Sequence, residues 1–181
     1  INSIATIDSL LQQIGKTLFE VFSDVQMVCI LLKENGEDLE AKLIETRVTD
    51  HSVPLNISWS VINEAVSEEV SILAKDASHD DRFSASESIL AINLRSVMCA
   101  PLVNRGEVLG VIYLDNREKP ECFDEDDVAL LSALANQSAV AIDNSRLYEE
   151  IQEAYHEAIL ALMNTVEAKD HYTRGHSQRT S

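Results

Sequence analysis

Aromatic and charged side chains that could hold a planar ligand occur at Trp59, in the polar segment 75–83 and just beyond it. A planar ring stacks on an aromatic face, while polar groups hydrogen-bond to its edge, and a small cleft can hold a nucleobase or a similar molecule in this way. The candidate ligand-binding residues are Trp59, Asp76, Arg82, Phe83, Arg95, Ser96 and Asn116.

The same side chains also have a purely structural interpretation. Arg82 and Arg95 stand among many carboxylates and could simply pair with them, and Phe83 could fill the core. Residue types alone leave both interpretations open for each position.

Cysteine and histidine chemistry is less favoured. The three cysteines, Cys29, Cys99 and Cys122, are widely spaced, which excludes a disulfide scaffold and a Cys-x-x-Cys metal site and suggests a reducing, cytoplasmic setting. Cys99 lies among apolar residues and is expected to be a small buried side chain. His51 and His79 have no companion ligand nearby in the sequence, so haem or iron binding is weakly indicated.

The charge balance limits the partners. Among 181 residues, 14 Lys+Arg stand against 31 Asp+Glu, for a formal net charge of -17. Nucleic acids and anionic membranes need clustered positive charge, so neither is expected as a general partner. No apolar run approaches the ~18 residues that a membrane span needs. The chain begins at Ile1 without Met, so we expect a piece of a longer protein.

The first half of the chain predicts mixed helices and strands. Apolar residues at steps of three and four predict a helix over 4–22. Two apolar, β-branched runs around Asn35-Gly36 predict a hairpin. Next we expect a short extended stretch, a helix, a strand, a polar loop and a short helix, over 53–59, 60–68, 70–74, 75–83 and 84–93.

The second half carries the clearest strand signals. Two strands, 96–103 and 108–116, are joined by a short loop in which Gly106 can adopt the positive φ that the turn needs. The run 108–114 is nearly all apolar, so this strand is expected to be central in its sheet and covered on both faces.

A long helix is predicted after this hairpin. Asp124 can cap its start, and the acidic residues 125–127 favour the positive end of the helix dipole. A helix of about 40 residues would be roughly 60 Å long, which exceeds what this domain can cover. We therefore expect residues 149–168 to pair as a parallel coiled coil in a homodimer.

This order of elements resembles the GAF domain, over about residues 4–148. The matching segments are Arg95–Val103, Gly110–Arg117, Phe123 with Asp127, Leu134–Gln137 and, before them, Asp81–Ser84. The resemblance implies an α+β fold for residues 1–148: an antiparallel sheet of about six strands, the terminal helices on one face, and a small-molecule pocket on the other, roofed by residues 75–95.

Subgroups of this family imply more specific chemistry. Cyclic-nucleotide-binding members carry an Asn-Lys, Phe, Asp-Glu pattern, which Asn116, Arg117, Phe123 and Asp127 match in part. The resemblance implies a structural salt bridge between Arg117 and Asp127. Members that attach a bilin through cysteine, or reduce free methionine sulfoxide, carry cysteine patterns that this sequence lacks.

The last residues resemble the opening of an HD-GYP domain, a metal-dependent cyclic-di-GMP phosphodiesterase, whose truncated start would be residues 169–181. The resemblance makes Glu167 and His176 candidate ligands of a divalent metal such as Fe or Mn in a full-length protein. The His-Asp and Gly-Tyr-Pro signatures are absent, and a hydrolytic metal site needs more ligands, so this piece is expected to have no catalysis and no cofactor of its own.

Together these observations predict a regulatory module. A small molecule of unspecified identity, sensed in the cytoplasm without membrane contact by this piece, would change the packing of the paired helices that lead to the phosphodiesterase. Two alternatives remain: a structural dimerisation spacer with an empty pocket, and, less favoured, a cyclic-nucleotide-binding domain.

Overall fold

The computed structural model describes residues 6–34, 38–47, 56–83 and 94–177, with side chains up to Thr165 in the last range. The chain divides into two compact units, Ile1–Asp143 and Asn144–Ser181. The predicted short helix over 84–93 lies outside the described residues.

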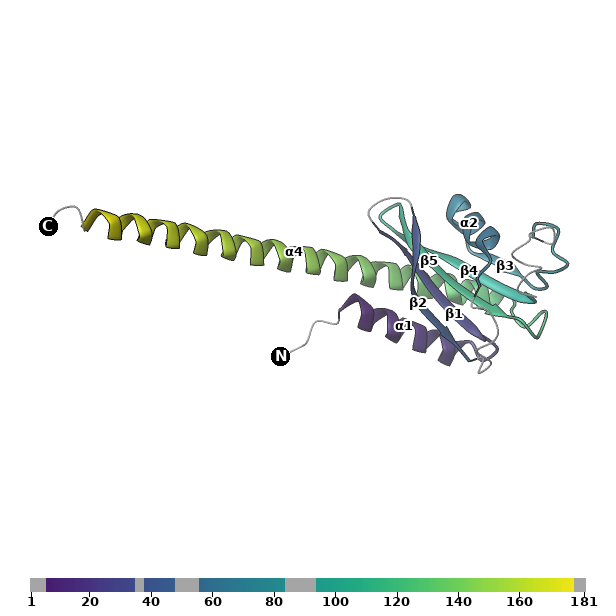
Figure 1. Ribbon diagram of the computed structural model, residues 1–181. Coiled ribbons are helices and arrows are strands. Elements are labelled where there is room, and N and C mark those ends of the chain that lie inside the picture. The colour runs from purple at the N-terminus through teal and green to yellow at the C-terminus, as the bar shows by residue number, and fades with distance from the viewer. Residues whose placement is uncertain (1–5, 35–37, 48–55, 84–93, 178–181) are drawn as a thin grey trace. The chain divides into compact units, whose positions relative to one another are not determined.

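The first unit is an α+β fold built on one antiparallel sheet (Figure 1). Its described elements are α1 (Ile7–Val21), β1 (Met27–Lys33), β2 (Leu39–Thr46), α2 (Trp59–Glu68), β3 (Ile72–Ala74), β4 (Ser96–Asn104), β5 (Glu107–Asn116) and the start of α4 (Glu125–Ser177). The sheet order is β2-β1-β5-β4-β3, so the prediction that the apolar strand is central is confirmed. The described residues form five strands, where about six were expected.

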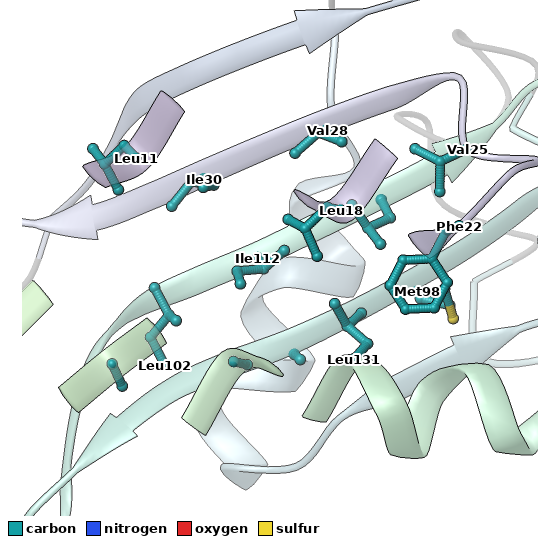
Figure 2. Close-up of a cluster of buried hydrophobic side chains, with 14 of the residues drawn as sticks. Leu11, Leu18, Phe22, Val25, Val28, Ile30, Met98, Leu102, Ile112 and Leu131 are labelled. Atoms are coloured by element: carbon teal, nitrogen blue, oxygen red, sulfur yellow. The ribbon is translucent and has the colours of Figure 1, made fainter. Parts of the chain in front are cut away.

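One face of the sheet, which we call the α1/α4 face, is covered by the two terminal helices. Alternate residues of the strands, among them Val28, Ile30 and Ile112, pack against Leu18 of α1 and Leu131 of α4 (Figure 2). All of these side chains are buried and apolar. The expectation of both terminal helices on one face is therefore confirmed.

The opposite face, which we call the α2 face, is covered by α2 (Figure 1). The other alternate residues of the strands, including Cys29, Cys99 and Tyr113, form a second buried cluster with Val61 and Ile62 of α2. Phe83 of the following loop is 1% exposed and belongs to the same cluster. Period-two alternation along each strand thus separates two cores.

Glycine is required at two points of the central strands. Gly106 has φ +82°, in the turn between β4 and β5, as the hairpin prediction anticipated. Gly110 faces the neighbouring strand β1, and a Cβ there would clash with the Leu31 carbonyl oxygen. A larger residue at position 110 would force β1 and β5 apart.

The start of α4 is capped as predicted. Asp124 Oδ1 accepts hydrogen bonds from the backbone N–H groups of Asp126 at 2.9 Å and Asp127 at 3.0 Å. Asp127 Oδ2 in turn accepts from the Asp124 backbone N–H at 3.0 Å. This reciprocal arrangement satisfies orphan donors of the first helical turn.

The described residues of the second unit, 144–177, form a single stretch of α4, which has 53 residues in all. Its described side chains carry a row of exposed apolar residues: Tyr148 is 42% exposed, Ile151 66%, Tyr155 69% and Leu162 67%. Within the described residues, no helix is both long and apolar enough to cross a membrane.

Candidate functional site

A row of polar side chains interrupts the apolar α2 face. Tyr113 and Asp115 are alternate residues of β5, and Arg117 follows the strand directly, so all three point to the same side of the sheet. The Tyr113 hydroxyl donates to Asp115 Oδ2 at 3.2 Å, and Arg117 Nε donates to the same oxygen at 3.4 Å. One carboxylate oxygen therefore holds two neighbours.

The same row contacts the segment that leads into α2. The Ser58 backbone N–H donates to the Tyr113 hydroxyl at 3.4 Å. Arg117 Nη2 donates to the Asn56 carbonyl at 2.6 Å, and the Arg117 backbone N–H donates to Gln26 Oε1 at 2.8 Å. The polar row thus joins β5 to the residues immediately before α2.

The Asp115 carboxyl lies in an unfavourable environment for a charge. It is 0% exposed, and its Oδ1 has no hydrogen-bond partner among the described residues. Burial raises the pKa of Asp115 to about 6, against the opposing effects of Arg117 and the Tyr113 hydroxyl. Burial also raises the pKa of Tyr113 well above its usual range, so the phenol stays protonated and donates.

Asp76, shortly after β3, and Arg95, directly before β4, are both predicted site residues and lie together. Asp76 Oδ1 accepts from the Ser78 hydroxyl at 2.6 Å, and its Oδ2 lies 2.9 Å from His79 Nδ1 and 3.9 Å from Arg95 Nη2. The Ser78 hydrogen bond is the largest cause that lowers the pKa of Asp76, and Arg95 and His79 add to it. This cluster is held by its own internal contacts.

Arg82 and Phe83 form a second group in that loop. Arg82 Nη2 donates to Asp80 Oδ2 and to the Leu73 carbonyl, both at 2.8 Å, and its guanidinium lies 4.8 Å from the Phe83 ring centroid. Hydrogen bonding to Arg82 lowers the pKa of Asp80. Arg82 also pairs with Glu64 of α2 at 3.4 Å, so it fastens the loop to that helix.

Two other predicted ligand-binding residues, Ser96 and Asn116, are cross-strand partners on β4 and β5, and the Arg95 backbone N–H donates to the Asn116 carbonyl at 3.2 Å. Ser96 is buried, with its hydroxyl 3.5 Å from the Ala74 carbonyl. Asn116 Nδ2 donates to the Asp24 carbonyl at 2.6 Å, and its Oδ1 accepts two backbone N–H groups of the following turn. Trp59 is 45% exposed at the first residue of α2.

An open depression of about 430 Å³ lies beside the loop after β3. Among the predicted ligand-binding residues, Asp76 lines it, and the remaining lining residues are Leu73, Lys75, His79, Asp80 and Glu125. The structure therefore does not gather all seven predicted residues around this depression.

The predicted salt bridge between Arg117 and Asp127 needs correction. Arg117 pairs with Asp115, and Asp127 accepts from the Asp124 backbone N–H as part of the α4 cap. The Asp127 carboxylate is used in the cap of α4. The side chain of Arg117 lies on the α2 face, next to Asp115. The correct structural partner is two residues away in the sequence.

The cysteines are held as protonated thiols. Cys99 is fully buried, as predicted, and burial raises its pKa far above the usual range. Burial likewise raises the pKa of Cys29 to about 12. Cys122 is half-buried and its pKa is raised, again mainly by burial. Thiolate chemistry is therefore disfavoured at all three positions.

The metal-ligand candidates can be placed by their backbone alone. Glu167 and His176 both lie within α4, nine positions apart, which corresponds to about 13 Å of helix rise. Among the residues with described side chains, no group of three or more His, Cys, Asp or Glu could hold a metal.

Tyr113 and Asp115 were missed by the sequence analysis as site residues. The available signal was an aspartate two positions after a tyrosine in an otherwise apolar central strand, because alternate residues share a face. A polar side chain on a strand covered on both faces must be buried, and a buried polar group needs a partner.

Three comparisons with known proteins give a consistent result. A sequence model of the GAF domain matches residues 6–142. Hybrid signal transduction histidine kinase G from Dictyostelium discoideum is 26% identical over 106 residues, which are 59% of this chain and 3% of that protein. The chain thus spans a small part of this curated relative.

Solved structures share the fold at low identity. The photoproduct state of GAF3 from Slr1393 of Synechocystis has a TM-score of 0.66 with 13% identity, and the match covers 81% of this chain and 99% of that one. The GAF domain/HD domain protein from Geobacter sulfurreducens has a TM-score of 0.63 with 15% identity, covering 80% and 96%.

Proposed function

This chain belongs to the GAF domain family, and from that premise we propose that residues 1–148 sense a small cytoplasmic molecule and report its binding through a homodimeric helix at residues 149–168. The observation that carries the sensor proposal is the buried polar row on the α2 face, Tyr113, Asp115 and Arg117. A core that needed only stability would be apolar there, as it is on the α1/α4 face.

Ligand binding is tested on the whole chain by thermal shift with cyclic nucleotides and common metabolites. A ligand at 100 times its dissociation constant adds about 2.7 kcal/mol of stability. Native mass spectrometry of protein purified from cells provides a second readout, because a retained small molecule supports the sensor. A chain that is empty by both measurements supports the alternative, a structural dimerisation spacer.

The transmitting helix is proposed to pair through one row of exposed apolar residues. Tyr148, Ile151, Tyr155 and Leu162 recur at spacings of three, four and seven, which is the pattern of a coiled-coil seam. The acidic residues Glu149, Glu150, Glu153 and Glu157 fall outside those positions. A parallel pair would therefore bury the apolar row and leave the like charges in water.

This seam is tested with a charge placed in it. Leu162→Glu is expected to shift the chain from dimer to monomer in sedimentation equilibrium, because a buried carboxylate would face its copy. Leu160→Glu is the matched control, since position 160 lies outside the row, and it should leave the dimer intact. A wild-type chain that is monomeric at all concentrations contradicts the proposal.

The output is proposed to be an HD-GYP phosphodiesterase that begins near residue 169, with a divalent metal such as Fe or Mn held in that output domain. Glu167 and His176, which both lie within α4, are proposed to be ligands of that metal in the full-length protein. In a full-length protein, Leu162→Glu should abolish the effect of the sensed ligand on phosphodiesterase activity. If the ligand still changed phosphodiesterase activity in this variant, the proposal that the paired helix transmits the signal would be contradicted.

A further inference from the structure

The Asp115 carboxyl keeps one buried oxygen that lacks a partner in the described part of the first unit. Its Oδ1 and the Ser145 hydroxyl are the buried side-chain polar atoms without a partner among the described residues, and Asp115 alone of these two is ionisable. Leaving a buried acceptor unpaired costs about 1–3 kcal/mol, and more when it is charged. Such an exception in a native core calls for an explanation.

The contacts of Asp115 show what depends on it. Its Oδ2 accepts from Tyr113 and from Arg117, at 3.2 and 3.4 Å. Tyr113 then accepts from the Ser58 N–H, and Arg117 donates to the Asn56 carbonyl. Both of these contacts reach the segment Asn56–Ser58, which directly precedes α2. A change at Asp115 Oδ2 therefore affects how this segment is attached to the sheet.

We propose that Tyr113, Asp115 and Arg117 form a proton-responsive latch, in which the ionised carboxylate holds Asn56–Ser58 against β5 and uptake of one proton by Asp115 loosens that hold. The proton binds at the carboxylate, which becomes a neutral acid, and Arg117 loses its charge partner on β5. This device requires neither a sensed ligand nor a second copy of the chain.

The groups around Asp115 are consistent with this behaviour. Among the described residues, Arg117 and the Tyr113 hydroxyl lower its pKa, and burial, together with the charge of Asp115, raises the pKa of Cys29, across on β1, so that this thiol stays neutral. Burial outweighs them and raises the pKa of Asp115 to about 6. Because Arg117 favours the ionised form, protonation and release of Arg117 favour each other.

Loosening this segment would act on the cover of the α2 face. Ser58 is the residue that caps α2, and Ile62, in its first turn, donates its N–H to the Ser58 carbonyl at 3.2 Å. Ile62 and its neighbour Val61 are fully buried against the sheet. A released latch therefore changes how firmly the first turn of α2 covers the face on which Tyr113 and Asp115 lie.

Hydrogen exchange over residues 56–62 tests the latch, measured between about pH 5 and pH 7.5 and divided by the chemical exchange rate of the unprotected peptide at each pH. Protection is expected to fall about 5-fold or more on acidification, with a midpoint near the pKa of Asp115. The side chain in Asp115→Asn carries no charge at any pH, so the protection of residues 56–62 in this variant should be low and should not change with pH.

Two further variants make the result decisive. Asp24→Asn, at an exposed carboxyl that pairs with Lys119, is the matched control and should keep the wild-type pH profile. Arg117→Gln removes the contact between Arg117 and the Asn56 carbonyl but retains Asp115, so the protection of residues 56–62 should be low at every pH. Wild-type protection that does not change with pH overturns the proposal even if no variant folds, and so does an Asp115→Asn profile with the wild-type midpoint.

Discussion

The two faces of the sheet are built from the same strands and differ in one respect. On β5, Ile112 and Leu114 face α1 and α4 and meet only apolar partners, whereas Tyr113 and Asp115 face α2 and form a hydrogen-bonded row. Apolar contacts have no protonation state, and a buried carboxylate does. The stability that the α1/α4 face provides should therefore not depend on pH, whereas the contribution of the α2 face can change with pH.

The largest expected effect comes from the apolar face. Ile112→Ala leaves a cavity in the centre of the α1/α4 core and should lower the free energy of unfolding by about 2–5 kcal/mol in urea denaturation. The loss should be equal at about pH 5 and about pH 7.5, because the buried residues of this cluster carry no titratable group and the pKa of Cys122, which packs against them, is raised above its usual value. Ile44→Ala on β2, where the side chain is 41% exposed, is the control and should cost much less. If the loss of unfolding free energy for Ile112→Ala depended on pH, the proposed difference between the two faces would be contradicted.

The second effect is the pH dependence of the α2 face. The folded-state pKa of Asp115, about 6, lies above its ordinary value of 3.8, so the folded chain binds this proton more tightly than the unfolded chain. Unfolding free energy should therefore increase on acidification, by about 1.4 kcal/mol between pH 7.5 and pH 5 from this group. Urea denaturation at both pH values measures it.

Asp115→Asn separates this effect from other titrations, because the variant has no proton to bind and should lack that increase. Below about pH 4 the trend should reverse, since Asp76 and Asp80 have lowered pKa values and their contribution is lost as they protonate. A wild-type stability that decreases steadily from pH 7.5 to pH 5 would contradict the raised pKa of Asp115.

The elements were predictable because their signals are local and periodic. The strand Val108–Asn116, the cap at Asp124 and the turn at Gly106 depend on residues within a few positions of one another, and each prediction was confirmed. Repeated apolar spacing also predicted the two terminal helices, whereas the face that they share was an expectation from the family resemblance.

The partners within the candidate site were not predictable in the same way. Asn116 binds the carbonyl of Asp24, 92 positions away, which no local pattern shows. The choice of Asp115 over Asp127 as the partner of Arg117 depends on which side of β5 the arginine occupies, and on the helix cap that already engages Asp127. Family resemblance supplied the residue types but not these pairings.

The third prediction concerns the cap of α4, which positions that helix on the apolar face. Asp124→Ala removes the acceptor for the Asp126 and Asp127 N–H groups and should lower the unfolding free energy by about 1 kcal/mol. Asp124→Asn retains an acceptor oxygen and should recover most of the loss. Equal losses for both variants in urea denaturation would show that the charge, and not the hydrogen bond, matters at this position.

The smallest effect is expected at the polar loop beside α2, where Arg82 pairs with Asp80 and Glu64 on a half-exposed surface. Exposed ion pairs contribute about 0.2–1 kcal/mol, so Arg82→Gln should cost less than about 1 kcal/mol, and less still in about 1 M salt than in about 0.1 M salt. Arg82→Lys, which keeps the charge but not the forked geometry toward the Leu73 carbonyl, separates charge from hydrogen bonding. A loss above about 2 kcal/mol at both salt concentrations would mean that the loop, like the row on β5, holds α2 in place. The loop at residues 75–83 would then have to be counted, with Tyr113, Asp115 and Arg117, among the parts that hold α2 on the sheet.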